Sequence, residues 1–392
     1  MFKAYEVKPG IYWVGAIEWN ERYIHGFSMP EGSTNNAYLI IDEKVALIDT
    51  CTPGFQGELL ERIADAVDPA RIDYIVSNHG EKDHAGSIAE VLAAAPNAKL
   101  VTSDPQGLKI LKRYYGDNRE YLPVKSGDEL SLGARTLQFI HTPMVHWPDN
   151  MVTYCPQEKM LFSNDAFGQF LATSRRFDDE VDRAQALACA KKYFANIVMP
   201  FAKQTAKAVA AVRSLGLDLI APSHGVIWRS GIEDILDRYE AWCALEPAEA
   251  AVVVYASMYG ATGQMARAIT EAFMAAGIRV RLYDLQVSDI SDIMTEVMDA
   301  RYVAVGSSTH NKTVLPPMGE FLTYLKGLAP KGRCGIAFGS YGWAADGARE
   351  IAEVMEGAGF QLPLEPLTAD WNEDAEGAQK VFGAIEGLIG RA

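Results

Sequence analysis

The run Asn78-His79-Gly80-Glu81-Lys82-Asp83-His84 constrains this chain more than any other feature of the sequence. It contains four side chains that can ligate a metal ion, namely His79, Glu81, Asp83 and His84. It follows a short apolar stretch, 74–77, that predicts a strand, and it precedes a stretch, 87–95, that predicts a helix. We therefore expect all four side chains to lie on one strand-to-helix loop, where they can converge on a point.

Three later residues occupy similar positions, each just after a predicted strand: His146, Asp165 and His224. Because the downstream ends of strands in an α/β layer fold share one edge of the sheet, we expect these residues to join the run. The combined set contains histidines and carboxylates but no thiolate, which favours iron or manganese. Seven ligands suffice for two metal ions, and Asp165 is the candidate to bridge them because a carboxylate can give one oxygen to each.

Each of these residues also has a structural interpretation when taken alone. A single histidine is usually a hydrogen-bonded core or surface residue. Asp83 could cap the following helix, Asp165 could be a turn residue, and Glu81 could be a solvated charge. Four such residues within six positions are much harder to explain structurally, so the sequence favours a metal centre.

The chain changes character near residues 245–249. Upstream, short strands alternate irregularly with helices, as in an α/β layer domain that is not simply doubly wound. Downstream, strands and helices alternate regularly, which predicts a parallel sheet with helices on both faces. With 392 residues the chain is long enough for two domains, which we expect at 1–246 and 250–392.

The bulk composition excludes several classes of function. A formal net charge of −15 argues against nucleic acid and against anionic membrane surfaces as partners. No apolar run approaches the length of a bilayer span, and the N-terminus lacks the pattern of a secretion signal. The five cysteines are scattered and form no CxxC pair, which is typical of the reducing cytoplasm. We therefore expect a cytoplasmic protein.

The downstream half contains three loops that could hold a flavin. The first, 257–262, lies between a predicted strand and a predicted helix, where backbone N–H groups and hydroxyls form a phosphate cradle without any basic residue. The other two follow later strands, at 306–311 and 339–343, and would flank an isoalloxazine ring, as in a flavodoxin-like sheet that binds FMN. The candidate FMN residues are Ser257, Met258, Tyr259, Gly260, Ala261, Thr262, Ser307, Ser308, Thr309, His310, Asn311, Ser340, Tyr341, Gly342 and Trp343. The structural alternatives are a helix cap in the first loop and ordinary loop aromatics in the third.

Taken together, four motifs resemble those of the flavodiiron proteins: HxExDH at 79–84, His146-Trp147-Pro148-Asp149, Ser163-Asn164-Asp165 and Pro222-Ser223-His224-Gly225. The resemblance implies a metallo-β-lactamase-like αββα sandwich with a non-haem diiron centre, followed by a flavodoxin-like domain, in the minimal two-domain form. Hydrolase relatives carry HxHxDH and bind zinc, whereas this chain has Glu81 at the second histidine position. By resemblance, His79, Glu81 and His146 hold one iron, Asp83, His84 and His224 hold the other, and Asp165 bridges them.

The resemblance also implies an activity, which is reduction of O2 to water, of NO to N2O, or of both. Electrons would pass from an external donor of the rubredoxin type to FMN and then to the two irons. A head-to-tail homodimer, or a tetramer built from such dimers, would bring the two sites together. Ser308 replaces the proline that many members carry in their second flavin loop. Two alternatives stay open at this point: a zinc hydrolase with an appended flavin domain, and a non-enzymatic electron carrier with a vestigial metal site.

Overall fold

The computed structural model describes residues 1–371 and 375–390. The chain divides into two compact units, which are described separately. The first comprises Met1–Arg22, Met29–Tyr193 and Phe201–Ala244. The second comprises the chain from Leu245 onward together with two short segments, Tyr23–Ser28 and Phe194–Pro200.

Two sheets form the centre of the first unit. The larger has the order β1-β2-β7-β8-β9-β10-β11, with bounds Tyr5–Lys8, Ile11–Trp13, Tyr38–Ile41, Val45–Ile48, Ile72–Ser77, Lys99–Ser103 and Tyr121–Val124. The smaller has the order β12-β13-β14-β15-β16, with bounds Glu129–Ser131, Thr136–His141, Met151–Cys155, Met160–Asn164 and Leu219–Pro222. The hairpins β7–β8 and β14–β15 are antiparallel, while β8, β9, β10 and β11 run parallel. Short ladders join β3 (Ala16–Glu18) to β6 (Ser33–Asn35) and β4 (Tyr23–Ile24) to β5 (Phe27–Ser28).

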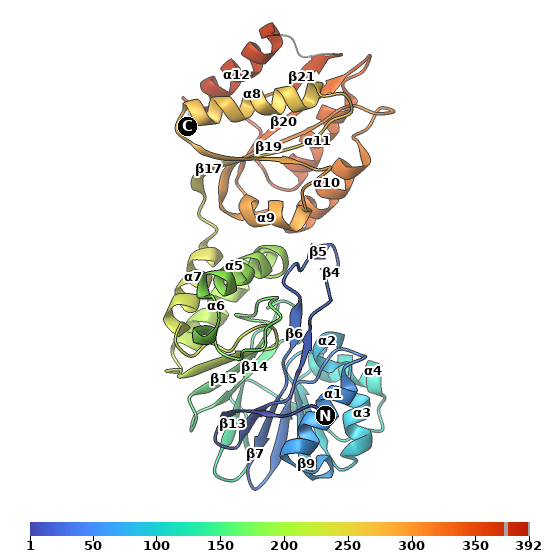
Figure 1. Ribbon diagram of the computed structural model, residues 1–392, viewed down its shortest axis with the longest axis vertical. Coiled ribbons are helices and arrows are strands. Elements are labelled where there is room, and N and C mark those ends of the chain that lie inside the picture. The colour runs from blue at the N-terminus through green and yellow to red at the C-terminus, as the bar shows by residue number, and fades with distance from the viewer. Residues whose placement is uncertain (372–374, 391–392) are drawn as a thin grey trace. The chain divides into compact units, whose positions relative to one another are not determined.

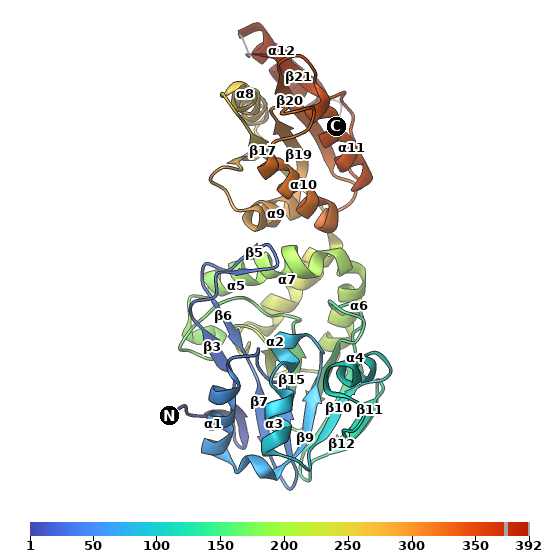
Figure 2. The same cartoon turned by 90° about the vertical axis from the view of Figure 1, so that its right-hand side faces the viewer.

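Helices cover the outer sides of both sheets (Figures 1 and 2). On the side of the larger sheet lie α1 (Gln56–Ala66), α3 (Ile88–Ala94) and α4 (Gln106–Tyr115), with the short α2 (Lys82–Ala85) at its end. On the other side lie α5 (Arg183–Tyr193), α6 (Ala202–Arg213) and α7 (Ile232–Ala244). The result is the predicted αββα sandwich.

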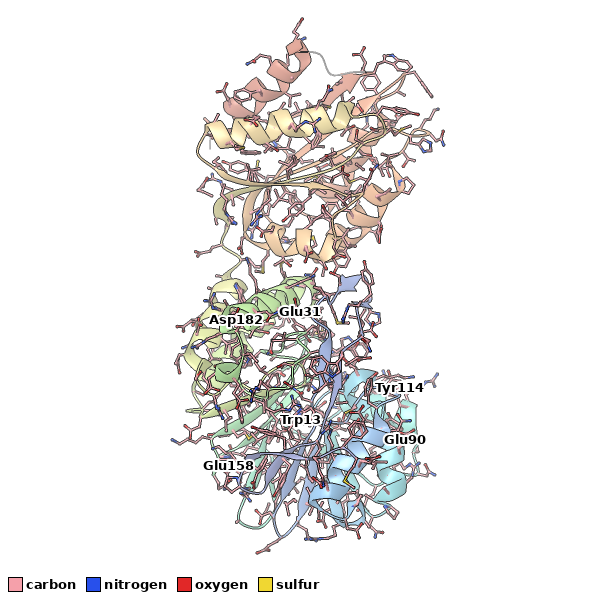
Figure 3. All side chains as sticks on the ribbon, in the orientation of Figure 1. Trp13, Glu31, Glu90, Tyr114, Glu158 and Asp182 are labelled. Atoms are coloured by element: carbon pink, nitrogen blue, oxygen red, sulfur yellow. The ribbon has the colours of Figure 1, made fainter. Side chains whose placement is uncertain are left out.

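Two apolar cores hold this sandwich together. The first lies between the sheets and includes Trp13, Phe139 and Phe162, all almost completely buried; Trp13 is labelled in the interior in Figure 3. The second lies between the larger sheet and its helices and includes Leu47, Leu59 and other aliphatic side chains. Strand β8 is buried along its whole length because both of its faces are covered, which explains its uninterrupted apolar sequence.

The second unit is a parallel sheet of order β18-β17-β19-β20-β21, with bounds Arg279–Asp284, Ala248–Ala256, Ala300–Ser307, Cys334–Tyr341 and Leu367–Asp370. Helices α8 (Ala261–Ala275) and α12 (Ala375–Ile389) cover one face. Helices α9 (Ile290–Asp299), α10 (Pro316–Leu328) and α11 (Asp346–Gly357) cover the other. This strand order is that of flavodoxin, in which ligands bind at the carboxyl ends of the strands. In the described part of the chain, no helix has the length and apolarity needed to cross a membrane.

Candidate metal centre and flavin site

All seven predicted metal ligands lie at one end of the sandwich and form two adjacent groups. The ligand atoms within each group lie within 4.8 Å of one another. One group contains His79, Glu81, His146 and Asp165, and the other contains Asp83, His84 and His224. The flavodiiron resemblance divides the other six residues in the same way and assigns Asp165 to both groups.

Two details of the predicted placement are wrong. Asp83 and His84 do not lie on a loop, because residues Lys82–Ala85 form the short helix α2, whose N–H groups at positions 84 and 85 donate to the Glu81 carbonyl. The ligands also do not share the edge of a single sheet. His79 follows β9 of the larger sheet, whereas the other three segments follow strands of the smaller sheet. The two sheets pack face to face, so their ends meet at the same end of the sandwich.

Asp165 lies between the two groups and turns one oxygen to each. Its Oδ1 lies 2.9 Å from Nε2 of His84 and 3.7 Å from Nε2 of His224. Its Oδ2 lies 3.5 Å from Nε2 of His146 and 3.8 Å from Nε2 of His79. The side chain is almost completely buried. A carboxylate so placed can bridge two cations.

Several ligand atoms are buried without a hydrogen-bond partner. Among the described residues, none forms a hydrogen bond with Asp83 Oδ1, His84 Nε2 or Asp165 Oδ2. His84 Nε2 and Asp165 Oδ1 are 2.9 Å apart, yet the two atoms do not form a hydrogen bond. Buried polar atoms are normally satisfied. Unpaired atoms on imidazole and carboxylate groups therefore fit a pair of metal ions.

The proximity of opposite charges dominates the electrostatics of the site. Burial lowers the pKa of His79, but hydrogen bonds with Asp149 and Glu81 outweigh it and raise the pKa to about 10. Burial likewise lowers the pKa of His84, but the charges of Asp83 and Asp165 raise it to about 10. Burial also lowers the pKa of His146, but hydrogen bonds with Asp165 and Glu81 raise it to about 10. Cations and carboxylates stabilise one another here, so an incoming metal must displace protons.

Residues outside the ligand set orient the ligands. Nδ1 of His79 lies 3.1 Å from both carboxylate oxygens of Asp149, and Nδ1 of His224 donates to the Thr34 carbonyl at 2.7 Å. Each contact fixes the ring and leaves Nε2 facing the centre, as outer partners of metal-bound histidines do. The Tyr193 hydroxyl donates to Asp165 Oδ1 at 3.0 Å.

These three partners were not predicted from the sequence. Asp149 lies inside the His-Trp-Pro-Asp motif and could have been found from the need of a ligating histidine for a carboxylate partner. Thr34 contributes only its backbone, and Tyr193 lies on a helix with ordinary spacing, so neither gave a signal in the sequence.

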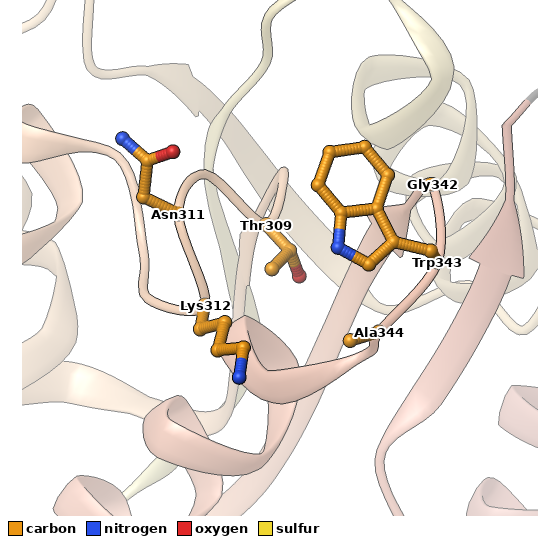
Figure 4. A pocket seen from close by; sticks show the side chains of 6 residues that line it. All are labelled: Thr309, Asn311, Lys312, Gly342, Trp343 and Ala344. Carbon is orange, nitrogen blue, oxygen red and sulfur yellow. The ribbon is translucent and has the colours of Figure 1, made fainter.

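The flavin loops enclose a cavity of ≈ 220 Å³ at the carboxyl end of the parallel sheet. Eleven of the predicted residues line it: Met258, Tyr259, Ala261, Ser308, Thr309, His310, Asn311, Ser340, Tyr341, Gly342 and Trp343. Trp371, just after β21, also lines the cavity and was not predicted, because β21 is far from the three loops in sequence. A smaller hollow beside it lies between Lys312 and Trp343 (Figure 4).

The four predicted residues that do not line the cavity, Ser257, Gly260, Thr262 and Ser307, form hydrogen bonds within and between its loops. The fully buried Thr262 places its hydroxyl 2.9 Å from that of Ser308 and 2.7 Å from that of Ser340, so it ties the three loops together. Ser257 accepts from the Gly260 N–H, and Gly260 has a left-handed backbone at φ +98°. Ser307 accepts from the Leu315 N–H. Hydroxyls and a helix start without basic residues suit the phosphate of FMN.

Fold and site together define a class of protein, in which a β-lactamase-like sandwich with a histidine–carboxylate metal centre precedes a flavodoxin-like sheet. Comparison with known families agrees: the ODP family beta lactamase matches residues 33–225 and the flavodoxin family matches residues 253–384. The chain is 42% identical to the nitric oxide reductase of Moorella thermoacetica, with 96% of each chain covered.

Two solved structures are similar over nearly the whole chain. The rubredoxin oxygen:oxidoreductase of Desulfovibrio gigas has a TM-score of 0.96 and 38% identity, with 99% of this chain and 98% of that chain covered. The flavodiiron protein of Giardia intestinalis has a TM-score of 0.95 and 35% identity, with 100% and 97% covered. This chain belongs to the flavodiiron protein family, as its motifs predicted.

Proposed function

We propose that this protein reduces O2 to water, NO to N2O, or both, at a non-haem diiron centre that receives electrons through FMN. The observation that best supports this is the position of Asp165, whose two oxygens face two separate groups of ligands. His79, Glu81 and His146 would hold one iron, Asp83, His84 and His224 the other, and Asp165 both. The zinc hydrolase alternative is not favoured, because the relatives named above are oxidoreductases and Glu81 replaces the hydrolase histidine.

When bound, the two irons supply electrons to the diatomic substrate, and FMN resupplies them from the donor. Reduction of O2 to two waters takes four electrons and four protons. Coupling of two NO molecules to N2O and water takes two of each. The protein must therefore position the ligands, admit protons and keep bulk water away from the reacting molecule.

The chain's own residues can perform these tasks. Asp149 and the Thr34 carbonyl hold the rings of His79 and His224 in one orientation. Burial, together with the neighbouring Asp165 charge, raises the pKa of Tyr193 well above its usual value, so this phenol keeps its proton and donates it to Asp165 Oδ1 as a hydrogen bond. The Trp147 ring packs nearly perpendicular to that of His79, with 5.0 Å between the ring centroids, and so covers one side of this imidazole.

For FMN we propose Ser257–Thr262 as the phosphate loop, with Thr309–Asn311 and Tyr341–Trp343 beside the isoalloxazine ring. Trp371 is added to this set because it lines the same cavity. We further propose a small rubredoxin-like protein as the donor, a head-to-tail homodimer as the working assembly, and a cytoplasmic location, consistent with five free cysteines. The domain limits are proposed at 1–246 and 250–392.

Metal and flavin analysis followed by rapid mixing tests the proposal. Protein made with ample ferrous salt is expected to hold two irons and one FMN per chain, and after anaerobic reduction to be oxidised rapidly by O2, by NO or by both. Two zinc ions with indifference to FMN would support the hydrolase instead. FMN without metal would support an electron carrier.

A further inference from the structure

The loops that carry the metal ligands share a buried carboxylate that is not itself a candidate ligand, Asp49. It follows strand β8 and is 4% exposed. Its Oδ1 accepts a hydrogen bond from the backbone N–H of Asn78 at 2.8 Å. Its Oδ2 accepts from Nδ2 of Asn78 at 3.1 Å and from Nδ2 of Asn164 at 3.2 Å. Each of these donors belongs to the residue immediately before a ligand, His79 in one case and Asp165 in the other.

The contacts extend to a third ligand loop. Nδ2 of Asn164 also donates to Oγ of Ser223 at 3.1 Å, and the backbone N–H of Ser223 donates to the Asn164 carbonyl at 2.8 Å. Ser223 immediately precedes His224. Asp49, Asn78, Asn164 and Ser223, which we call the Asp49 network, therefore join the starting points of three ligand-bearing segments from both sheets.

The next residue reaches a fourth ligand. The backbone N–H and the hydroxyl of Thr50 both donate to the His84 carbonyl, each at 2.7 Å. Two consecutive residues at the end of one strand thus contact segments that carry ligands of both metal groups. Within the described residues, β9 of the larger sheet forms no ladder with β15 or β16 of the smaller one, so these polar contacts connect the ligand segments across the two sheets.

The hydrogen bonds of the network require a particular side chain at position 49. All three groups that face Asp49 are N–H donors, so the residue at this position must be an acceptor at both oxygens. Asp49 and Asn164 both have left-handed backbones, at φ +55° and +53°. Aspartate and asparagine tolerate this conformation better than other side chains except glycine. An asparagine at position 49 would therefore keep the backbone but place an amide N–H₂ against other N–H₂ groups.

We propose that Asp49 is a positioning residue for the metal centre, whose carboxylate fixes the segments of His79, Asp165 and His224 so that both metal groups form together. This inference rests on the proposed function, because it presumes that those groups bind metal. A merely structural aspartate would stabilise the fold without affecting the metal centre in particular.

Exchanging the carboxylate of residue 49 with the amide of residue 164 tests this positioning role. In the double variant Asp49→Asn/Asn164→Asp, the carboxylate introduced at position 164 can accept from the amide introduced at position 49, from Ser223 Oγ and from Nδ2 of Asn150, which lies 3.4 Å from Oδ1 of Asn164 in the wild type. A flip of the Asn78 amide then lets its oxygen accept from the amide at position 49 while its nitrogen donates to Thr153, whose hydroxyl in the wild type donates to Asn78 Oδ1 at 2.7 Å. The double variant can therefore satisfy all four members of the Asp49 network and leaves only the Thr153 hydroxyl to find a new acceptor, whereas Asp49→Asn places amide donors against each other within the network.

Asp178 provides a matched control. It is fully buried and accepts three hydrogen bonds, from the backbone N–H groups of Arg229 and Ser230 and from the Ser230 hydroxyl. Asp178→Asn makes the same chemical change in a comparable setting without contacting any residue beside a ligand. The experiment compares five full-length proteins: wild type, Asp49→Asn, Asn164→Asp, the double variant and Asp178→Asn. For each we measure iron content per chain, iron affinity by competition with a chelator, the spectrum of the half-oxidised metal pair, and thermal stability.

We expect Asp49→Asn to weaken binding of both irons together, on the order of tenfold or more, and to alter the spectrum. The double variant should recover most of the iron affinity and the spectrum, and Asp178→Asn should lose stability but keep both irons. Normal iron binding in Asp49→Asn, no recovery in the double variant, or an equal loss of iron in Asp178→Asn would each overturn the role of Asp49. A wild type that binds no metal pair would instead refute the proposed function itself.

Discussion

The metal centre and the flavin cavity are built by opposite means. The metal centre uses imidazole and carboxylate side chains, four of them buried and three half-buried, which are held by further side chains, such as Asp149 behind His79 and the Asp49 network behind three segments. The flavin cavity uses loop backbone, hydroxyls and aromatic rings, and several of those rings are exposed: Tyr259 by 91%, Trp343 by 83% and Trp371 by 71%. Small cations of high charge demand fixed ligand geometry, whereas a large organic cofactor distributes its contacts. Single substitutions should therefore have large effects at the first site and graded effects at the second.

The largest effect is expected from Asp165→Asn. An amide cannot give an anionic oxygen to both metal groups, so both irons should bind more than about 100-fold more weakly and turnover should be lost, while FMN stays bound. Iron analysis, flavin absorbance and rapid mixing with O2 or NO measure the three properties. Full activity in this variant would remove Asp165 from the bridging position.

Metal binding should also depend steeply on pH. Because His79, His84 and His146 have pKa values of about 10 in the metal-free protein, they are protonated at neutral pH and must each lose a proton to bind metal. Release of three protons makes the overall affinity rise about a thousandfold per pH unit from about pH 7 to pH 9. Chelator competition at several pH values measures this slope, and an affinity independent of pH would contradict it.

The folding stability of the metal-free protein should change with pH in the opposite direction, falling as the pH rises. These pKa values are raised above those of unfolded histidine, so the ion pairs contribute their full stability below about pH 6.5 and lose it as the pH rises through about 10. Metal-free protein should therefore melt at lower temperature at pH 10 than at pH 7, and iron-loaded protein should not share this particular loss. Thermal unfolding of both forms at the two pH values tests the difference.

Asp149→Asn should have an intermediate effect. The amide keeps the size of the side chain but weakens its hold on the His79 ring, so iron affinity should fall by about 10–100-fold, with FMN unaffected. Asp178→Asn again serves as the control for the loss of a buried carboxylate. Unchanged iron affinity would make Asp149 a structural residue only.

Thr262→Ala tests the flavin cavity in the same way. Its hydroxyl ties the three flavin loops together in the first turn of helix α8, so its loss should weaken FMN binding by about 1.5–3 kcal/mol, with both irons retained. Thr262→Ser should retain most of the affinity because the hydroxyl is preserved. Flavin fluorescence titration gives both values, and an equal loss in the two variants would exclude the hydroxyl as the cause.

The smallest effect is expected from Trp371→Ala. The ring is 71% exposed, and stacking on a flavin would contribute only about 0.5–1 kcal/mol. FMN should bind a few-fold more weakly, and its fluorescence should increase because tryptophan quenches it. Trp371→Phe should lie between the two, and unchanged fluorescence in the alanine variant would place the ring away from the flavin.

At both sites some residues could be predicted from the sequence and others could not. The proposed metal ligands could be picked out from the sequence because such a cluster of histidines and carboxylates is rare and its members follow predicted strands. Asp49 was not, because an aspartate after an apolar strand is common and its role depends on Asn78 and Asn164, which are distant in sequence. The flavin loops were predictable from the alternation of strands and helices, whereas Trp371 reaches the cavity only because β21 is the neighbour of β20. The short helix α2 was missed because a single turn has no detectable periodicity.

The origin of the ligands in both sheets has a consequence for the life of the protein in a cell short of iron. Neither sheet on its own could capture the metal pair, so loading has to follow assembly of the whole sandwich. Once bound, the cations would link the larger sheet to the smaller one through their shared ligands. In iron-starved cells the molecules without metal would depend on the histidine–carboxylate ion pairs and the Asp49 network alone to connect the sheets at this end, so a protease that cleaves transiently opened segments should digest them faster than iron-loaded molecules.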